Sequence, residues 1–427
     1  MLSLSFLLIA RLFALVSAWQ YVFTDSESDA CHESCFTTDV GAFQTVKTPI
    51  WFSQSPRDSF ERSKLGAVNG SAWEQWYFET VSESSRGAFV MAFSRDPSYK
   101  GLGYGILRVE LIFAWENGTR TTMTEFAEQS RVQDCCGRVR GRWSTQESVY
   151  EFDVSADLQT ATITMDTPSV RGTVKLKSFG PARYPDGAQW PSRTASTEVC
   201  PGLHFTEAMT AAHADIDLIV QGSRLSFKGL GGHNHVWAPF DWFTIVQGWH
   251  LLRATAGPYA FTLWNPISKI DGGATYQSAM LLENGKPIFN AALRESNATS
   301  DSMMDHVLLQ RSYGGNVTAP FGDESTGWQI SFVSPSSAVR WHFTASHQSQ
   351  IFEVALGGGK GLAGFTDSIV GGRVDGEQFS GYAIYEQVEL PPKMGIAVMF
   401  RVWWSHKALL KTSILGSLWR SILGMLY

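Results

Sequence analysis

The stretch Tyr104-Gly-Ile-Leu-Arg-Val-Glu-Leu-Ile-Phe-Ala-Trp115 alternates between apolar and polar side chains over most of its length. Side chains two positions apart on an extended chain point to the same face. One face then carries apolar residues only, namely Leu107, Val109, Leu111, Phe113 and Trp115. Arg108 and Glu110 fall on the opposite face, so the stretch predicts a β-strand that is buried on one side.

The same period of two recurs along the chain, over residues 149–154, 161–165, 173–177, 215–220, 259–264, 328–333, 339–343 and 381–388. Glycine, asparagine, aspartate and proline separate these stretches, as turns require. The chain has no strand–helix–strand repeat and no phosphate-binding glycine motif. The predicted fold class is therefore all-β.

The number of strands bears on the domain organisation. More than about a dozen short strands exceed what one ordinary barrel or sandwich holds. We therefore expect two antiparallel β domains, over residues 40–240 and 245–405, which meet near residues 235–248.

The two ends of the chain differ from the rest. Residues 1–18 are apolar and end in Val16-Ser-Ala18, a pattern that predicts a signal peptide and a location in the secretory pathway or outside the cell. Residues 408–427 carry apolar side chains at helical spacing, which predicts an amphipathic helix packed on the protein or lying on a membrane surface.

Two further features agree with secretion. Sequons predict glycosylation at Asn69, Asn117, Asn297 and Asn316. The five cysteines do not follow a zinc pattern, and in the secretory pathway we expect one or two disulfides and at least one free thiol. The neighbours Cys135 and Cys136 would each bond a distant partner.

Composition argues against several classes of protein. The formal net charge is −6 and no basic run occurs, which argues against nucleic-acid binding. Beyond the N-terminus no run of about 18 apolar residues occurs, which argues against a polytopic membrane protein. Aromatic residues make up 13% of the chain, more than a core requires, and favour a small hydrophobic substrate.

Residues 229–253 concentrate polar side chains among aromatic rings. His233 and His235 are two positions apart, so both rings would project to one face of a strand. Asp241, His250 and Arg253 follow, together with Trp237, Trp242 and Trp249. Histidines held among aromatic rings can transfer protons near neutral pH, and tryptophan faces stabilise positive charge.

This segment has two other interpretations. The histidines are core residues in one of them, bonded to the backbone. In the other they supply two metal ligands, with His250, Glu74 or Glu386 as the third. Because no spacing defines that third ligand, we predict no metal.

A second cluster is Trp73-Glu-Gln-Trp-Tyr-Phe-Glu79. Alternation places Trp73, Gln75 and Tyr77 on one face, and Glu74, Trp76 and Phe78 on the other. A carboxylate that shares a face with aromatic rings is either an exposed strand residue or a buried acid with a raised pKa. Glu386, which shares a face with Tyr382 and Ile384, has the same two interpretations.

Three stretches resemble the fungal Diels–Alderase group: Trp73–Glu79, the glycine-rich run ending at Trp237, and residues 252–259. The His233-Asn-His235 stretch departs from the decalin-forming members. It is more similar to the hydroxyneurosporene synthase (carotenoid hydratase-like) relatives, a subgroup that includes quinolone-epoxide-rearranging enzymes and hetero-Diels–Alderases. The resemblance implies two lipocalin-like β domains with a pocket between them and no organic cofactor.

The resemblance and the histidine pair together lead to a functional hypothesis. We expect an acid-assisted isomerase or cyclase that forms or rearranges rings of a hydrophobic fungal metabolite. The expected acids or their partners are His233, His235, Asp241, Glu74 and Glu386. The expected substrate contacts are Trp73, Trp76, Trp237, Trp242, Trp249, His250 and Arg253. The alternatives are a concerted intramolecular Diels–Alderase that forms a decalin-type ring and a non-catalytic, lipocalin-like carrier of an apolar metabolite.

Overall fold

The computed structural model describes residues 35–102, 104–294 and 303–392. The predicted signal peptide and C-terminal helix lie outside these residues. Within the described part of the chain, no helix has the length and apolar character needed to cross a membrane.

The first sheet is an antiparallel half-barrel of thirteen strands. Hydrogen bonds join twelve of them in the order β1-β6-β7-β8-β9-β10-β12-β13-β2-β3-β4-β5, and β11 pairs with β12. The strands are β1 (Phe36–Gly41), β2 (Trp73–Ser82), β3 (Ala88–Arg95), β4 (Leu107–Ala114), β5 (Arg120–Phe126), β6 (Gln129–Cys135), β7 (Arg138–Ser144), β8 (Val149–Val154), β9 (Thr160–Asp166), β10 (Val170–Ser178), β11 (Glu198–Cys200), β12 (Leu203–Val220) and β13 (Ser223–Ala238). A 3₁₀ helix, η1 (Pro97–Leu102), precedes β4.

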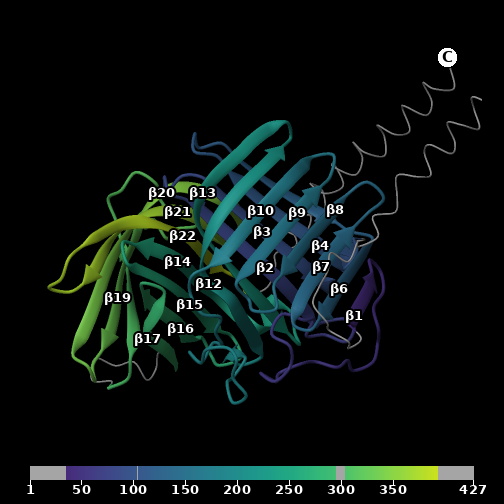
Figure 1. Ribbon diagram of the computed structural model, residues 1–427, viewed down its shortest axis with the longest axis horizontal. Helices are drawn as coiled ribbons and strands as arrows, with labels where there is room; N and C mark the ends of the chain where they lie inside the picture. Colours follow the sequence, from purple (N-terminus) through teal and green to yellow (C-terminus); the bar gives the residue numbers. More distant parts are fainter. Residues whose placement is uncertain (1–34, 103, 295–302, 393–427) are drawn as a thin grey trace, which may run out of the picture. The chain divides into compact units, whose positions relative to one another are not determined.

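The second sheet is a nearly closed antiparallel barrel of nine strands. Their order is β17-β16-β15-β14-β22-β21-β20-β19-β18, drawn from green to yellow in Figure 1. The strands are β14 (Val246–Ala256), β15 (Tyr259–Ser268), β16 (Ala274–Glu283), β17 (Lys286–Arg294), β18 (His306–Ser312), β19 (Gly327–Ser334), β20 (Val339–Gly357), β21 (Lys360–Arg373) and β22 (Phe379–Glu389). The buried Gln277 side chain bonds both the N–H and the carbonyl of Val307, and so links β16 to β18.

β4 covers Leu107–Ala114 of the stretch from Tyr104 to Trp115, and each of the other alternating stretches lies within one strand, so the predicted all-β fold class is confirmed. The apolar face of Leu107–Ala114 is buried as expected, and Glu110 is partly exposed. Arg108 differs from the expectation, because it is also buried. Its guanidinium forms an ion pair with Asp96 at 3.1 Å, which compensates for the lost hydration.

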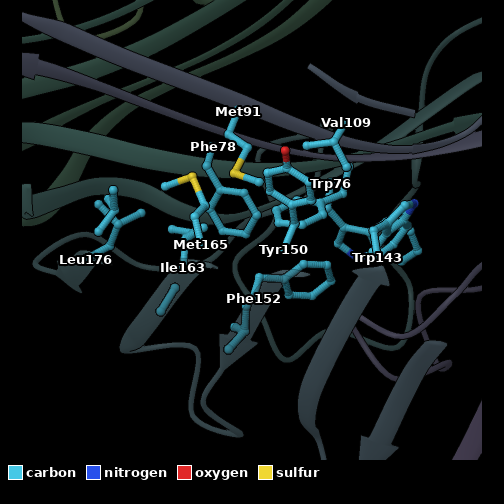
Figure 2. Packing of buried hydrophobic residues seen from close by; sticks show 14 of the residues in the cluster. Trp76, Phe78, Met91, Val109, Trp143, Tyr150, Phe152, Ile163, Met165 and Leu176 are labelled. Carbon is cyan, nitrogen blue, oxygen red and sulfur yellow. The ribbon is translucent and has the colours of Figure 1, made fainter. Parts of the chain in front are cut away.

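The core of the first sheet is built from aromatic and aliphatic side chains of neighbouring strands (Figure 2). Trp76 and Phe78 project from β2, and Trp143 and Phe152 from β7 and β8. Their ring centroids lie 5.6–5.7 Å apart between Trp76 and Trp143 and between Phe78 and Phe152. Many of the aromatic residues of the chain are thus ordinary core.

The chain passes from one sheet to the other through a short helix, α2 (Trp242–Ile245). The first sheet ends at Ala238 and the second begins at Val246, within the segment where the sequence predicts the domains to meet. The division into two domains with the stated bounds stays a prediction.

Disulfide chemistry follows the expectation for the vicinal cysteines. Cys35 bonds Cys135, and Cys136 is also disulfide-bonded. Among the described residues Cys200 is the free thiol, and it is buried.

Candidate functional site

The two predicted histidines lie in the interior of the first sheet. Their side chains point to the same face of β13, as the spacing predicts, and neither is exposed to solvent. His233 stacks on Phe78 at 3.9 Å and His235 stacks on Trp76 at 4.3 Å. Both rings therefore belong to the aromatic core of this sheet.

Each histidine faces a carboxylate that is also fully buried. The Nε2 atom of His233 lies 2.7 Å from an oxygen of Glu61, and its Nδ1 atom donates to the carbonyl of Tyr77 at 3.0 Å. His235 lies 3.7 Å from Glu74. Burial lowers the pKa of His235, which favours its neutral form.

Both oxygens of the Glu74 carboxylate have partners within the core. It accepts from the Ser63 hydroxyl and the Lys64 backbone N–H, both at 2.7 Å, and forms an ion pair with Arg95 at 3.2 Å. Burial opposes ionisation, but His235 and Arg95 outweigh it and hold the pKa of Glu74 below its usual value. Sequence reasoning assigned no partner to these groups, since Glu61, Ser63 and Lys64 lie in an irregular segment before β2.

The predicted tryptophans separate into two groups. Trp76 and Trp237 contact His235, with ring centroids at 4.3 and 5.3 Å. Trp73, Trp242 and Trp249 do not contact the histidines. They lie in an apolar cluster formed by residues of both sheets. Trp73 stacks on Trp242 with ring centroids 4.2 Å apart, and Trp242 packs at a tilt against Trp249 at 4.7 Å.

Glu386 lies beside the second group of tryptophans, where the two sheets meet. Its carboxylate accepts hydrogen bonds from the Tyr77 hydroxyl of β2 and the Trp249 indole N–H of β14, both at 2.8 Å. Burial raises its pKa to about 7 against these two bonds, which lower it, and the negative charge of Glu79 adds to the increase. Glu386 and Tyr77 are nevertheless partly exposed. We call Tyr77, Trp242, Trp249 and Glu386 the junction site.

Arg253 lies next to the junction site but is turned into the first sheet. Its guanidinium is fully buried and bonds the carboxylates of Glu79 at 2.8 Å and Glu207 at 2.9 Å. The resemblance and the sequence position suggested a substrate contact, whereas the structure shows an ion pair between the sheets.

The remaining predicted residues lie elsewhere. Asp241 caps α2 by accepting from the backbone N–H and the hydroxyl of Thr244. His250 is bonded to the Tyr385 hydroxyl at 2.6 Å inside the second sheet, and burial lowers its pKa to about 4. Neither side chain is part of the junction site.

The sequons that the structure describes lie in turns or irregular segments. Asn117 and Asn316 are exposed and Asn69 is partly exposed. Asn297 lies outside the described residues, and glycosylation and secretion stay predictions.

A cavity of about 710 Å³ lies against the first sheet and contains none of the predicted site residues. Residues 56–60 and 190–193 line it together with Leu158 and Tyr184. Across the described ranges, no three histidine, cysteine, aspartate or glutamate side chains are grouped as a metal ion would need.

Tyr77, Glu79 and Glu207 are the residues that sequence reasoning missed. Alternation along Trp73–Glu79 does place Tyr77 on the face of Trp73, which is the face that meets the second sheet. No sequence signal joins Tyr77 to Glu386, because the two residues are 309 positions apart.

Comparison with known proteins identifies the family. A family model described as Diels-Alderase-like matches residues 32–391. Diels-Alderase ffsF of Aspergillus flavipes is 39% identical over 89% of this chain and 92% of its own length. Hexane cyclase pydB of Acremonium sp. is 33% identical over 87% of this chain and 86% of its own length.

A solved structure shows the same fold. The crystal structure of CghA with Sch210972 superposes with a TM-score of 0.72 at 24% identity, and the match covers 84% of this chain and 99% of CghA. The family match spans both sheets and the junction site between them. This chain belongs to the Diels-Alderase-like family and is a cyclase of fungal secondary metabolism.

Proposed function

We propose that the protein catalyses an intramolecular [4+2] cyclisation at the junction site, with Glu386 as the acid that activates the substrate carbonyl. The observation that carries this proposal is a partly exposed carboxyl group held by Tyr77 and Trp249 beside packed tryptophans. Its pKa of about 7 keeps much of it protonated near neutral pH. The names of the relatives, which are Diels-Alderases and a hexane cyclase, support the reaction class.

The reaction requires no co-reactant. Four π electrons of a diene and two of an alkene form two new carbon–carbon bonds and one new double bond, so no atom enters or leaves. A hydrogen bond to a carbonyl conjugated with the alkene withdraws electron density from it and lowers the barrier. The protonated Glu386 carboxyl can donate that bond, while Tyr77 and Trp249 orient the group.

The aromatic side chains have a second task in this proposal. A flexible polyene must be folded so that the two reacting segments meet, and holding it so removes an entropic barrier. Trp242, Tyr77 and Phe243 are partly exposed apolar side chains of the cluster that both sheets form. They offer a surface for such a chain next to Glu386.

The histidine pair has a structural role in this proposal. His233 and His235 have no exposed surface and are stacked between the strands of the first sheet. A substrate at the junction site would meet the opposite face of β2, because Tyr77 and Phe78 point to opposite sides.

A linear test substrate with a conjugated diene tethered to an α,β-unsaturated ketone checks the proposal. Cyclisation removes the diene absorbance and is followed in the ultraviolet. Glu386→Ala should lower kcat at least about 100-fold, and Glu386→Gln should lose less because its amide still donates. Glu389→Gln is the matched control, since it removes a carboxylate from the opposite face of β22.

Normal turnover by Glu386→Ala would overturn the assignment of the acid. A wild-type protein that binds the linear compound and returns it unchanged would instead support the carrier. A solvent isotope effect on kcat separates full proton transfer from a hydrogen bond in a concerted cyclisation.

A further inference from the structure

Three buried or half-buried carboxyl groups gather where the two sheets meet, and two guanidinium groups accompany them. The carboxyls belong to Glu79 of β2, Glu207 of β12 and Glu386 of β22. The guanidiniums belong to Arg183 and Arg253, both fully buried. Three acids and two permanent cations leave one acid without a cationic partner.

The contacts show which acid that is. Arg253 bonds Glu79 through Nε at 2.8 Å and Glu207 through Nη2 at 2.9 Å. Arg183 bonds the other oxygen of Glu207 at 2.5 Å. Among the described residues, Glu386 has no arginine or lysine within ion-pair distance, and its bonded partners are the neutral Tyr77 and Trp249.

The strand register places Arg253 within reach of Glu386 as well. In the pairing of β14 with β22, Glu386 lies opposite Leu251 and Arg253 lies opposite Ile384. Arg253 and Glu386 therefore project from the same face of neighbouring strands, and their register positions differ by two residues. Such diagonal neighbours lie about 7–8 Å apart, a distance that long side chains can bridge. The guanidinium nevertheless extends away from Glu386.

The backbone of β13 makes room for that orientation. A Cβ atom on Gly232 would lie 1.9 Å from Cζ of Arg253, so the guanidinium occupies space that only a glycine leaves free. Nη1 also donates to the carbonyls of Met209 and Thr210. Backbone groups of the first sheet thus hold Arg253 in place.

We propose that Glu79 and Arg253 are positioning residues that direct the acidic proton of this cluster to Glu386. Arg253 stabilises the ionised form of Glu79, and Arg183 with Arg253 stabilises that of Glu207. The negative charge of Glu79 near Glu386, together with the lack of a cationic partner for Glu386 in the described part of the chain, disfavours ionisation of Glu386, so Glu386 keeps its proton. This inference rests on the proposed function, which uses that proton as the hydrogen-bond donor.

The pKa values of Glu207 and Glu386 are shifted in opposite directions, which agrees with this assignment. Burial opposes ionisation of Glu207, but Arg183 and Arg253 outweigh it and lower the pKa of Glu207. Burial raises the pKa of Glu386 and the charge of Glu79 raises it further. Burial also raises the pKa of Glu79, and Arg253 opposes that shift without reversing it. Where the surroundings of two carboxyl groups in one site move their pKa values apart, one group holds the proton and the other is ionised. The groups that act on Glu386 are Tyr77 and Glu79 from β2, Glu110 from β4 and Trp249 from β14. Arg253 and Glu207 act on Glu79.

The test is a pH titration of Glu386 itself in the full chain. Protein labelled with ¹³C at the glutamate side-chain carboxyl gives a signal for Glu386 that is absent from Glu386→Gln. We expect its midpoint near pH 7 in the wild type and lower by about 1 pH unit in Glu79→Gln, because removal of one negative charge leaves Arg253 in excess. The glutamine oxygen still accepts from Arg253, which preserves the fold.

Two further variants complete the experiment. Glu83→Gln, an exposed carboxylate just beyond the end of β2, should leave the midpoint unchanged. Glu207→Gln should lower the midpoint as Glu79→Gln does, and replaces it if Glu79→Gln fails to fold by circular dichroism. An unchanged midpoint in the folded variant would overturn the inference.

The titration separates this inference from the proposed function. A lowered midpoint together with normal cyclisation by Glu386→Ala would retain the charge arrangement and reject Glu386 as the acid. Lost cyclisation by Glu386→Ala with an unchanged midpoint in Glu79→Gln would retain the acid and reject the positioning role. If the proposed function and this inference both hold, the alkaline limb of the pH profile of kcat also moves to lower pH in Glu79→Gln.

Discussion

The buried network of the first sheet and the junction site contain the same kinds of residue in opposite settings. In the first, His233 and His235 face Glu61 and Glu74 with no exposed surface. In the second, Glu386 is partly exposed and has two neutral donors. An acid or base in a closed core is more often structural, and an acid at an open edge with a raised pKa is suited to catalysis.

The two regions are also connected. Tyr77 donates its hydroxyl to Glu386 on one side of β2 and accepts from His233 with its backbone carbonyl on the other. The network of the first sheet therefore fixes the strand on which half of the junction site is built. Three predictions test how far the roles of the two regions differ.

The largest effect should come from the closed network. His233→Ala removes a stacked ring and leaves the buried Glu61 without its partner, which should lower the free energy of unfolding by about 3–5 kcal/mol. Chemical denaturation measures this loss. The exposed His213→Ala should change stability by less than about 0.5 kcal/mol.

The same variant compares the two regions directly. At a temperature where His233→Ala is folded, kcat for the linear test substrate should equal that of the wild type. A fall in kcat of about 100-fold or more in the folded variant would identify the histidines, and not Glu386, as the catalytic acid.

The next effect is the pH dependence of the wild-type enzyme. The pKa of Glu386 is raised to about 7, so the protonated and active form is lost as the pH rises through 7. The rate should fall about tenfold for each unit above this value, and should level off below it. A rate that rises between pH 6 and 8 would show that an ionised group is the active form.

The raised pKa of Glu386 also makes the stability of the fold depend on pH. The folded chain retains a proton at Glu386 between about pH 4.5 and 7 that the unfolded chain has released. The contribution of this group to stability therefore decreases as the pH rises through that window. Glu386→Gln should remove that part of the pH dependence in thermal melts.

The smallest effect should come from Trp249. Trp249→Phe keeps an aromatic ring beside Trp242 but removes the N–H that donates to Glu386. We expect kcat to fall by about 3- to 10-fold, because the carboxyl is less well oriented. Since the lost bond favoured the ionised form, the alkaline limb of the pH profile should move to higher pH.

Trp73→Phe is the matched control for this change. Trp73 stacks on the same Trp242, but its N–H donates to the carbonyl of Phe240 and not to Glu386. An equal shift of the pH profile in both variants would mean that the tryptophan stack, and not the hydrogen bond, controls Glu386.

Local patterns were sufficient for the fold class because strand periodicity is a property of neighbouring residues. The stretch from Tyr104 to Trp115 predicted its own strand, and the alternation of Trp73–Glu79 correctly separated the two faces of β2. The spacing of His233 and His235 correctly predicted rings on one face. Burial of Arg108 was not predictable, since it depends on Asp96 in a preceding loop.

The sequence by itself determined an all-β chain, the positions of the strands that have an alternating pattern, and the resemblance to the family that the comparisons confirm. Only the tertiary structure decided which polar residues meet. Tyr77 and Glu386, or Arg253 and Glu79, are far apart in the chain, and strand pairing and contact between the sheets bring them together. Whether a carboxyl is a structural partner or an acid depends on burial and nearby charge, which are properties of the folded chain.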